Sequence, residues 1–306
     1  MSSPFVIVPA LSAVAIKYRH QNFIADQVMP RVPVDKQQFI SLSDRMADWM
    51  TPVDTTVGRT DAPKQMASSI QDPTYLATLD QGLDESVPNE DQFNGPNENA
   101  LMRATQRIMG LVSLQREMRV AAVFNNLANF AYSQAYSTGT TQWSDYANSD
   151  PLGDILKYLD MCFARPNKVV MGRRVWTVLS QHPKLVHLAN TSFTNGRISK
   201  QQFADLLEVD EIIVGDGWVN TAPKGQTANK VRIWGTMLAG VYQGNISPDS
   251  DGMWGYTAQF GARVAGTIVS PDIGIYGGLR VRAGESVREV VTAKEFGFLL
   301  TNVVTP

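Results

Sequence analysis

The sequence contains one cysteine and three histidines among its 306 residues. One cysteine allows no disulfide within the chain, which is typical of a reducing compartment. Cys162 lies in a helical pattern beside apolar residues, which favours a small buried side chain over a nucleophile. No HExxH, CxxC or GxSxG motif occurs, and His182 and His187 are spaced wrongly to share one helix face. The sequence therefore predicts no catalytic, cofactor-binding or metal-binding residue.

Charge of either sign is also scarce. Asp, Glu, Lys and Arg make up 18% of the chain, below the ~25% that is usual in soluble proteins. A surface short of charge indicates burial against other chains, or a surface rich in Ser, Thr, Asn and Gln. The net charge is −2, so no strongly basic domain is present to hold nucleic acid by electrostatics. A container that merely encloses nucleic acid is compatible with this charge.

Long apolar runs are absent. No stretch of eighteen apolar residues occurs, so we expect no membrane span. The apolar N-terminal stretch is interrupted by Pro9, and Lys17 and Arg19 follow it rather than precede it, unlike the pattern of a secretory signal. We interpret residues 1–35 as an N-terminal arm.

Two strand-like segments, 32–43 and 74–80, flank a long polar stretch that is rich in turn-forming residues. We interpret residues 36–80 as an extended β-hairpin loop whose middle cannot bury much against its own subunit. Its few large apolar residues share no helical or strand period, so we predict that they contact a neighbouring subunit. The predicted contacts are Trp49, Met50, Met66 and Ile70, with Trp49 and Met50 as the main anchors.

A helical pattern without proline then runs from about 97 to 136. Apolar residues step along it by three or four positions, and Asn97 is a suitable N-cap. At 1.5 Å per residue such a helix reaches roughly 55–60 Å, longer than a small globular core needs. We therefore predict a spine helix.

The segment “STGTTQWSDYANSDP” (137–151) follows this pattern and resembles a polar linker, yet it holds Trp143 and Tyr146. Beyond it the sequence alternates between helical and strand patterns, starting with Asp150 as N-cap before Pro151. The last fifty residues alternate as strands do. A domain boundary docked against another part of the protein is one interpretation of the two aromatics, and a catalytic loop is the other.

The order of segments resembles the major capsid proteins of tailed bacteriophages. The resemblance covers about residues 75–303, and its strength lies in the number and order of the matching strings. They are “LDQGLDESVPNED”, “LQREMRVAAVFNN”, “TTQWSDYANSDPLGDI”, “RPNKVVMGRRVWTVLSQHPKLV”, “VGDGWVNTAPKGQTANKVRIWG”, “TAQFGARVAG” and “RVRAGESVREVV”.

The resemblance implies the α+β Hong Kong 97-type capsid fold. It implies an N-terminal arm (1–35), an extended loop (36–80), a peripheral domain with the spine helix (81–143), a mixed α/β axial domain (144–255) and C-terminal strands that return to the peripheral domain (256–306). Trp143 and Tyr146 would then anchor the junction between spine helix and axial domain. Arg280 and Arg282 are further predicted contacts between subunits.

The function implied is structural: self-assembly into pentamers and hexamers of an icosahedral head that encloses double-stranded DNA without sequence-specific binding. Expected partners are other copies, a portal, a scaffold and a decoration protein, with assembly in the host cytoplasm and residence in the virion. The apolar arm starts at once, so the chain is either processed or relies on a separate scaffold. Lys64 lies in the extended loop, but no cross-linking partner matches. A nanocompartment shell protein of the same fold, and a soluble α/β enzyme or binding protein, are the alternatives.

Overall fold

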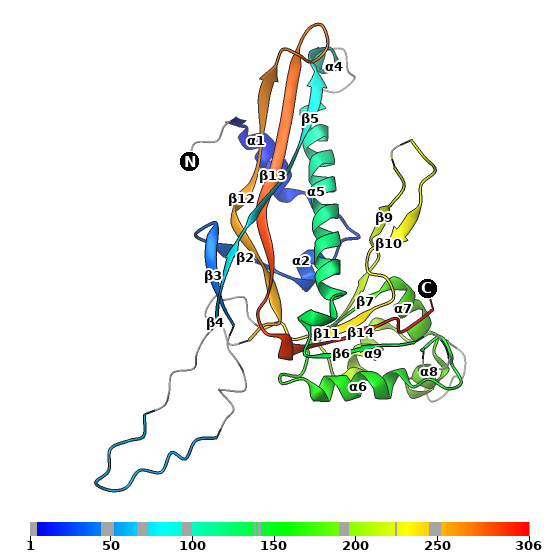
Figure 1. Ribbon diagram of the computed structural model, residues 1–306. Coiled ribbons are helices and arrows are strands. Elements are labelled where there is room, and N and C mark those ends of the chain that lie inside the picture. Colours follow the sequence, from blue (N-terminus) through cyan, green and yellow to red (C-terminus); the bar gives the residue numbers. More distant parts are fainter. Residues whose placement is uncertain are drawn as a thin grey trace.

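The computed structural model describes residues 5–43, 52–65, 72–93, 100–137, 139, 142–189, 196–223, 225–244 and 252–305. An elongated part, built from a long sheet and one long helix, stands on a second part of mixed helices and strands, and a loop extends away from both (Figure 1). The fold is α+β, as predicted. Within the described residues, no helix combines the length and apolar character needed to cross a bilayer.

The long sheet has the strand order β1-β12-β13-β5. Its strands are β1 (Val6–Ile7), β12 (Gly255–Ser270), β13 (Gly278–Val291) and β5 (Leu79–Pro88), all antiparallel to their neighbours. A further strand, β2 (Arg31–Val34), pairs in parallel with β12. The N-terminal segment, predicted as an arm, therefore contributes two strands to this sheet.

Helices cover one face of this sheet. α5 (Ala100–Phe124) packs along β13 and β5, and α1 (Pro9–Lys17) packs on β12 and α5. A short helix, α4 (Asn89–Phe93), lies at one end of the sheet next to β5, and another, α2 (Ala25–Val28), lies beside the lower half of α5 (Figure 1). The core between α5, α1 and the sheet includes Leu11, Ala15, Ala104, Ile108, Val112, Val281 and Ala283.

The long helix ends at Phe124, so the prediction that it continues to 136 is wrong. A short 3-10 helix (Leu127–Asn129) and β6 (Tyr132–Ala135) follow. The side chain of Asn126 accepts the N–H of Ala128 at 3.0 Å, and the amide of Asn129 donates to the carbonyl of Val123 at 2.9 Å. Asparagine side chains that bond to nearby backbone compete with the helical ladder, which is why the apolar periodicity does not extend the helix here.

The second part contains a five-stranded sheet of order β6-β14-β11-β7-β8. The strands after β6 are β14 (Gly297–Thr301), β11 (Leu238–Val241), β7 (Lys168–Gly172) and β8 (Glu211–Gly215). Strands β12 and β13 do return to the long sheet, but β14 pairs with β11 and β6. The prediction that residues 256–306 as a whole return to the peripheral part is therefore wrong for the last strand.

Alternate residues of β7 face two different cores. Val169 and Met171 pack against α6 (Pro151–Met161), α7 (Arg173–Leu179), α8 (Pro183–Ala189) and α9 (Lys200–Leu207). Val170 faces the opposite core, to which the C-terminal end of α5 contributes. A central strand buried on both faces explains the continuous apolar run Val169–Met171.

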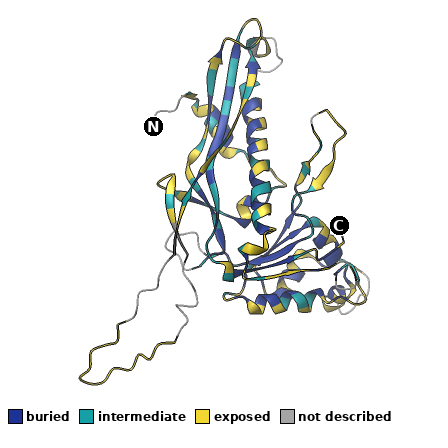
Figure 2. Cartoon of the chain, viewed as in Figure 1, coloured by how far each residue is buried: buried dark blue, intermediate teal, exposed yellow. Residues whose placement is uncertain are grey.

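Two hairpins project from the body. β3 (Gln38–Ser43) pairs antiparallel with β4 (Asp72–Ala77), which confirms the predicted hairpin. In the loop that it carries, every residue of 52–65 is exposed (Figure 2). The second hairpin consists of β9 (Trp218–Asn220) and β10 (Lys230–Arg232). A 3-10 helix (Lys294–Phe296) precedes β14.

Candidate functional site

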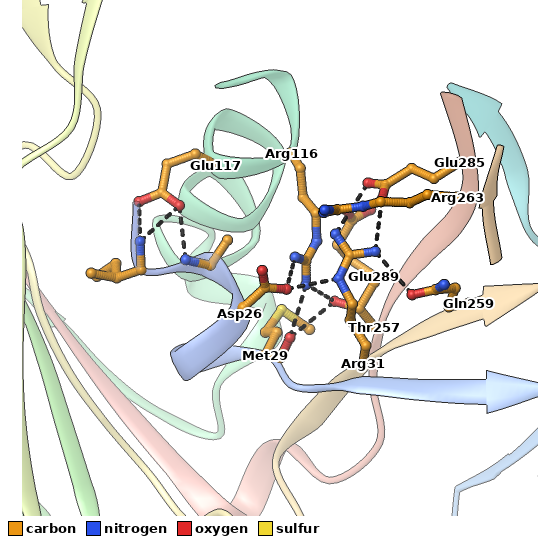
Figure 3. Close-up of polar contacts among 12 residues, drawn as sticks. Asp26, Met29, Arg31, Arg116, Glu117, Thr257, Gln259, Arg263, Glu285 and Glu289 are labelled. Atoms are coloured by element: carbon orange, nitrogen blue, oxygen red, sulfur yellow. Dashed lines mark hydrogen bonds and ion pairs between the residues drawn. The ribbon is translucent and has the colours of Figure 1, made fainter. Parts of the chain in front are cut away.

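Three arginines and two carboxylates meet where the N-terminal segment crosses the long helix and the long sheet (Figure 3). Arg31 of β2 and Arg263 of β12 each place a nitrogen 2.8 Å from the carboxylate of Glu285 on β13. Arg31 also lies 2.8 Å from Asp26 of α2, which forms a second ion pair with Arg116 of α5. We call these five residues the charge cluster.

Backbone and amide acceptors complete the cluster. Arg116 donates to the carbonyl of Met29 and to the hydroxyl of Thr257, both at 3.1 Å. Arg31 donates to the amide oxygen of Gln259 at 3.0 Å. Buried charges are tolerated when they are paired and hydrogen-bonded in this way. The cluster therefore fixes where the N-terminal segment lies on the helix and sheet.

Both carboxylates of the cluster are held in their charged form. Partial burial opposes ionisation of Asp26, but the charges of Arg116 and Arg31 outweigh it and lower its pKa to about 2. Burial likewise opposes ionisation of Glu285, and its bonds to Arg31 and Arg263 lower its pKa below the ordinary value. Neither group is poised to exchange a proton near neutral pH, so the cluster is structural in character.

Glu117, next to Arg116 on α5, joins three parts of the chain. Its carboxylate accepts the backbone N–H groups of Ile24 at 3.1 Å and Ala25 at 2.8 Å, where α2 begins. It also accepts the indole N–H of Trp234, which belongs to the second part, at 2.6 Å. Burial raises the pKa of Glu117, and the three N–H donors oppose that rise.

An aromatic group joins the end of α5 to the second sheet. The ring of Phe124 lies 5.7 Å from Trp234 and 4.4 Å from Trp254, and Phe130 stacks on Trp254 at 4.7 Å. Both tryptophans are fully buried. The sequence analysis missed this group because it interpreted the spacing of the apolar residues around Phe130 as continued helix.

Trp143 and Tyr146 both lie in the second part. Trp143 is fully buried; its backbone N–H donates to Val303 at 2.8 Å and its indole N–H to Asp154 of α6 at 2.9 Å. Tyr146 is 39% exposed and meets the ring of His182 edge-on. Trp143 thus attaches the segment after β6 to α6 and to the C-terminal segment. Contact with the spine helix is made by the Phe124 group instead.

Arg280 and Arg282 lie on the open face of the long sheet, because the alternating residues Val281 and Ala283 face the helices. Arg282 forms a bidentate ion pair with Asp84 of β5, and both hydrogen bonds are 2.7 Å long. Arg280 donates to Ser270 at 3.4 Å. Their contact with other subunits stays a prediction. Trp49, Met50, Met66 and Ile70 lie outside the described residues.

The described residues offer no catalytic arrangement. The hydroxyl of Ser149 lies 3.1 Å from Nε2 of His182, but Nδ1 of that ring has no partner among the described atoms, whereas a nucleophile–base pair needs an orienting group there. Burial lowers the pKa of His182 and raises that of Cys162 to about 12. In the same part of the chain no three His, Cys, Asp or Glu side chains could hold a metal ion.

Comparison with known proteins agrees with a structural role. No family model matches the chain. It is 42% identical to the major capsid protein of Pseudomonas phage JBD67 over 307 aligned residues, 99% of each protein. Among solved structures it is similar to a phage-related protein of Bordetella bronchiseptica, with a TM-score of 0.74 and 21% identity over 99% of this chain and 100% of that one. It is also similar to the putative capsid protein of an Escherichia coli prophage, with a TM-score of 0.58 and 13% identity over 98% and 99% of the two chains.

Proposed function

Because this chain belongs to the major capsid proteins of tailed bacteriophages and has the Hong Kong 97-type fold, we propose that its copies form pentamers and hexamers of an icosahedral head. It is a structural protein of the virion shell and not an enzyme. The nanocompartment alternative has less support, because the relative at 42% identity is a phage protein. Portal, scaffold and decoration proteins are proposed partners, the enclosed molecule is proposed to be double-stranded DNA, and assembly is proposed to take place in the host cytoplasm.

The observation that carries this proposal is the loop 52–65. Every residue in it is exposed, and it extends away from both parts of the chain (Figure 1, Figure 2). Ordering a backbone costs roughly 1–2 kcal/mol per residue, and no residue of this loop is buried in its own subunit in return. A neighbouring copy supplies the missing surface. In this proposal residues 1–35 are the N-terminal arm and residues 36–80 are the extended loop. The long sheet and α5 form the peripheral domain, and the second part of the chain is the axial domain.

The full-length chain is expected to form rings of five or six subunits, or closed shells, when purified. Size-exclusion chromatography followed by electron microscopy checks this, and a nucleic-acid assay of particle contents separates a head from a nanocompartment. The physical reason is the combination of a low share of charged residues in the chain with a loop, 52–65, whose residues are all exposed in the single subunit. A compact monomer that persists at high concentration across a range of salt would contradict the proposal.

Arg282→Ala is expected to impair assembly more than folding. The side chains of Arg282 and Asp84 are 40% and 27% exposed, and ion pairs at such exposure contribute about 0–1 kcal/mol. Urea unfolding of unassembled subunits should therefore change by less than about 1 kcal/mol, while shell yield falls. Arg165→Ala is the matched control: Arg165 is equally exposed and pairs with Asp160 at 2.7 Å in the second part. Loss of soluble, folded subunits with Arg282→Ala alone would show that the residue serves folding.

A further inference from the structure

The β9–β10 hairpin carries an exposed tryptophan that is held in place. Trp218 on β9 is 48% exposed, and the guanidinium carbon of Arg232, its cross-strand partner on β10, lies 4.0 Å from the centre of the ring. Arg232 also lies 3.7 Å from Asp216, just before the hairpin. A guanidinium stacked on the ring favours one orientation of it, so the ring loses little freedom when a partner covers it.

The hairpin has two free edges. β9 and β10 form a two-stranded sheet that no other strand of the described chain joins. On the face opposite Trp218, Val231 is 44% exposed. Two strands alone are marginally stable in water, and tryptophan and arginine are the side chains that contribute most to interfaces between proteins. The hairpin therefore presents a surface that another chain can cover.

The loop 52–65 of a second copy is the element that fits this surface. In one copy the loop and the hairpin project from opposite sides of the body (Figure 1). A ring of identical copies joins two different patches of each copy, so an element that projects from one side of a copy meets the opposite side of the next. The loop presents Val53 and Val57, which are 57% and 45% exposed, as apolar partners for Trp218.

The loop is prearranged for such a contact. Lys64 forms an ion pair with Asp54 at 2.6 Å, which joins its two arms. Between them the N–H of Asp61 donates to the carbonyl of Gly58 at 3.1 Å and closes a turn directly after Val57. A loop that is already closed in this way has less ordering left to undergo on binding.

Charge contributes to the register of this contact more than to its affinity. The acidic and basic residues of the loop balance one another; they are Asp54, Asp61, Arg59 and Lys64. Asp61 and Lys230 are both exposed, and neither forms an ion pair with a residue that the structure describes. Lys230 lies two positions before Arg232 on β10 and so shares its face of the hairpin. Opposite charges placed in this way select one alignment of the loop on the hairpin.

We propose that the loop 52–65 of one copy packs on the Trp218 face of the β9–β10 hairpin of the next copy, with Val57 against Trp218 and Asp61 beside Lys230. The inference rests on the proposed function, which requires a neighbour for the loop but does not say which surface the neighbour supplies. The contact lies on the paired strands of the hairpin and does not include its tip, residues 222–228.

The test uses the full-length chain with Val57→Cys and Lys230→Cys combined. Assembled particles are treated with a short bismaleimide, and the products are separated by denaturing gel electrophoresis. Cys162 is buried, so the unmodified chain gives the background. The double variant is expected to give a ladder that ends at five or six chains, whereas a mixture of the two single variants gives pairs only. Val57→Cys with Lys200→Cys, on α9, is the matched control and should give no ladder.

Trp218→Ala is expected to raise the lowest concentration at which shells form by at least about tenfold. Met161→Ala is its control, because Met161 is 44% exposed at the end of α6, and should leave that concentration unchanged. Normal shells without a ladder would overturn the contact and leave the proposed function standing, whether or not Trp218→Ala folds. A ladder together with an unchanged, folded Trp218→Ala variant would reject Trp218 as the anchor. A failure of the unmodified chain to assemble would instead overturn the proposed function.

Discussion

Replacing residues 46–71 with a short Gly-Ser link is expected to abolish shells and to leave a folded subunit. The flanking strands β3 and β4 pair through residues 38–43 and 72–77, so the link closes a hairpin whose two sides are already in register. The cores of the long sheet and of the second part contain no residue of the described loop 52–65. Circular dichroism and urea unfolding check the subunit, and electron microscopy checks the shells.

The matched control for this deletion shortens the other projecting hairpin. A Gly-Ser link in place of residues 222–228, between β9 and β10, removes exposed surface of a similar kind without touching the extended loop. If the loop deletion loses cooperative unfolding, the loop belongs to the core of its own subunit. If normal shells form without it, it is not the extended loop of a capsid subunit. Either result would reject the assignment.

Glu285→Gln is expected to lower the free energy of unfolding by about 3–5 kcal/mol, the usual cost of removing one partner from a buried ion pair. The side chain of Glu285 is 1% exposed and accepts from both Arg31 and Arg263. The amide keeps the shape but leaves two partly buried guanidinium groups without their shared counter-charge. Urea unfolding of unassembled subunits measures the loss. Asp84→Asn is the control, because it breaks an ion pair of similar geometry on the open face of the same sheet and should cost about 1 kcal/mol or less.

The stability of the folded subunit at acid pH is expected to depend on the same charge cluster. The ordinary pKa values are 3.8 for Asp26 and 4.5 for Glu285, and both are lowered in the folded chain, that of Asp26 to about 2. A lowered pKa stabilises the folded state above the unfolded pKa, and the stabilisation is lost as pH falls through the folded value. The unmodified subunit should therefore lose stability between about pH 4.5 and pH 2, and Glu285→Gln should lose less over that range. An identical acid profile in the two proteins would mean that Glu285 is not ionised in the fold.

Much of the fold could be predicted from local patterns in the sequence. The alternation in “TYLATLD” and the strand-like residues of 32–43 predicted a hairpin because these two segments directly flank one turn-rich stretch of the sequence. The spine helix was predictable up to Phe124. The end of the helix was not predictable, because the three asparagines after Phe124 are also compatible with a helix surface. The helix ends there because Phe130 packs against Trp254, which comes from a distant part of the sequence.

The charge cluster could not have been predicted in the same way. Arg31 and Glu285 are 254 positions apart, and Arg116 meets Asp26 across 90 positions. Each residue, taken singly, resembles an ordinary solvent-exposed charge, and only the topology that places β2 beside β12 brings them together. The resemblance to capsid proteins predicted the fold but said nothing of these partners, because it rests on the order of segments rather than on individual side chains.

The shared carboxylate of Glu117 has a consequence for how shells close. In the proposed shell, rings of five and of six copies would meet their neighbours at different angles, so part of each copy would have to change its conformation. A swing of the second part against the spine would break the bond to Trp234, and a shift of the N-terminal segment would break those to Ile24 and Ala25. Glu117 thus links the spine helix, the N-terminal segment and the second part through one carboxylate, and we expect these three parts to move together. We expect any adjustment between ring types to fall on segments outside these bonds, such as the exposed 52–65 loop and the β9–β10 hairpin.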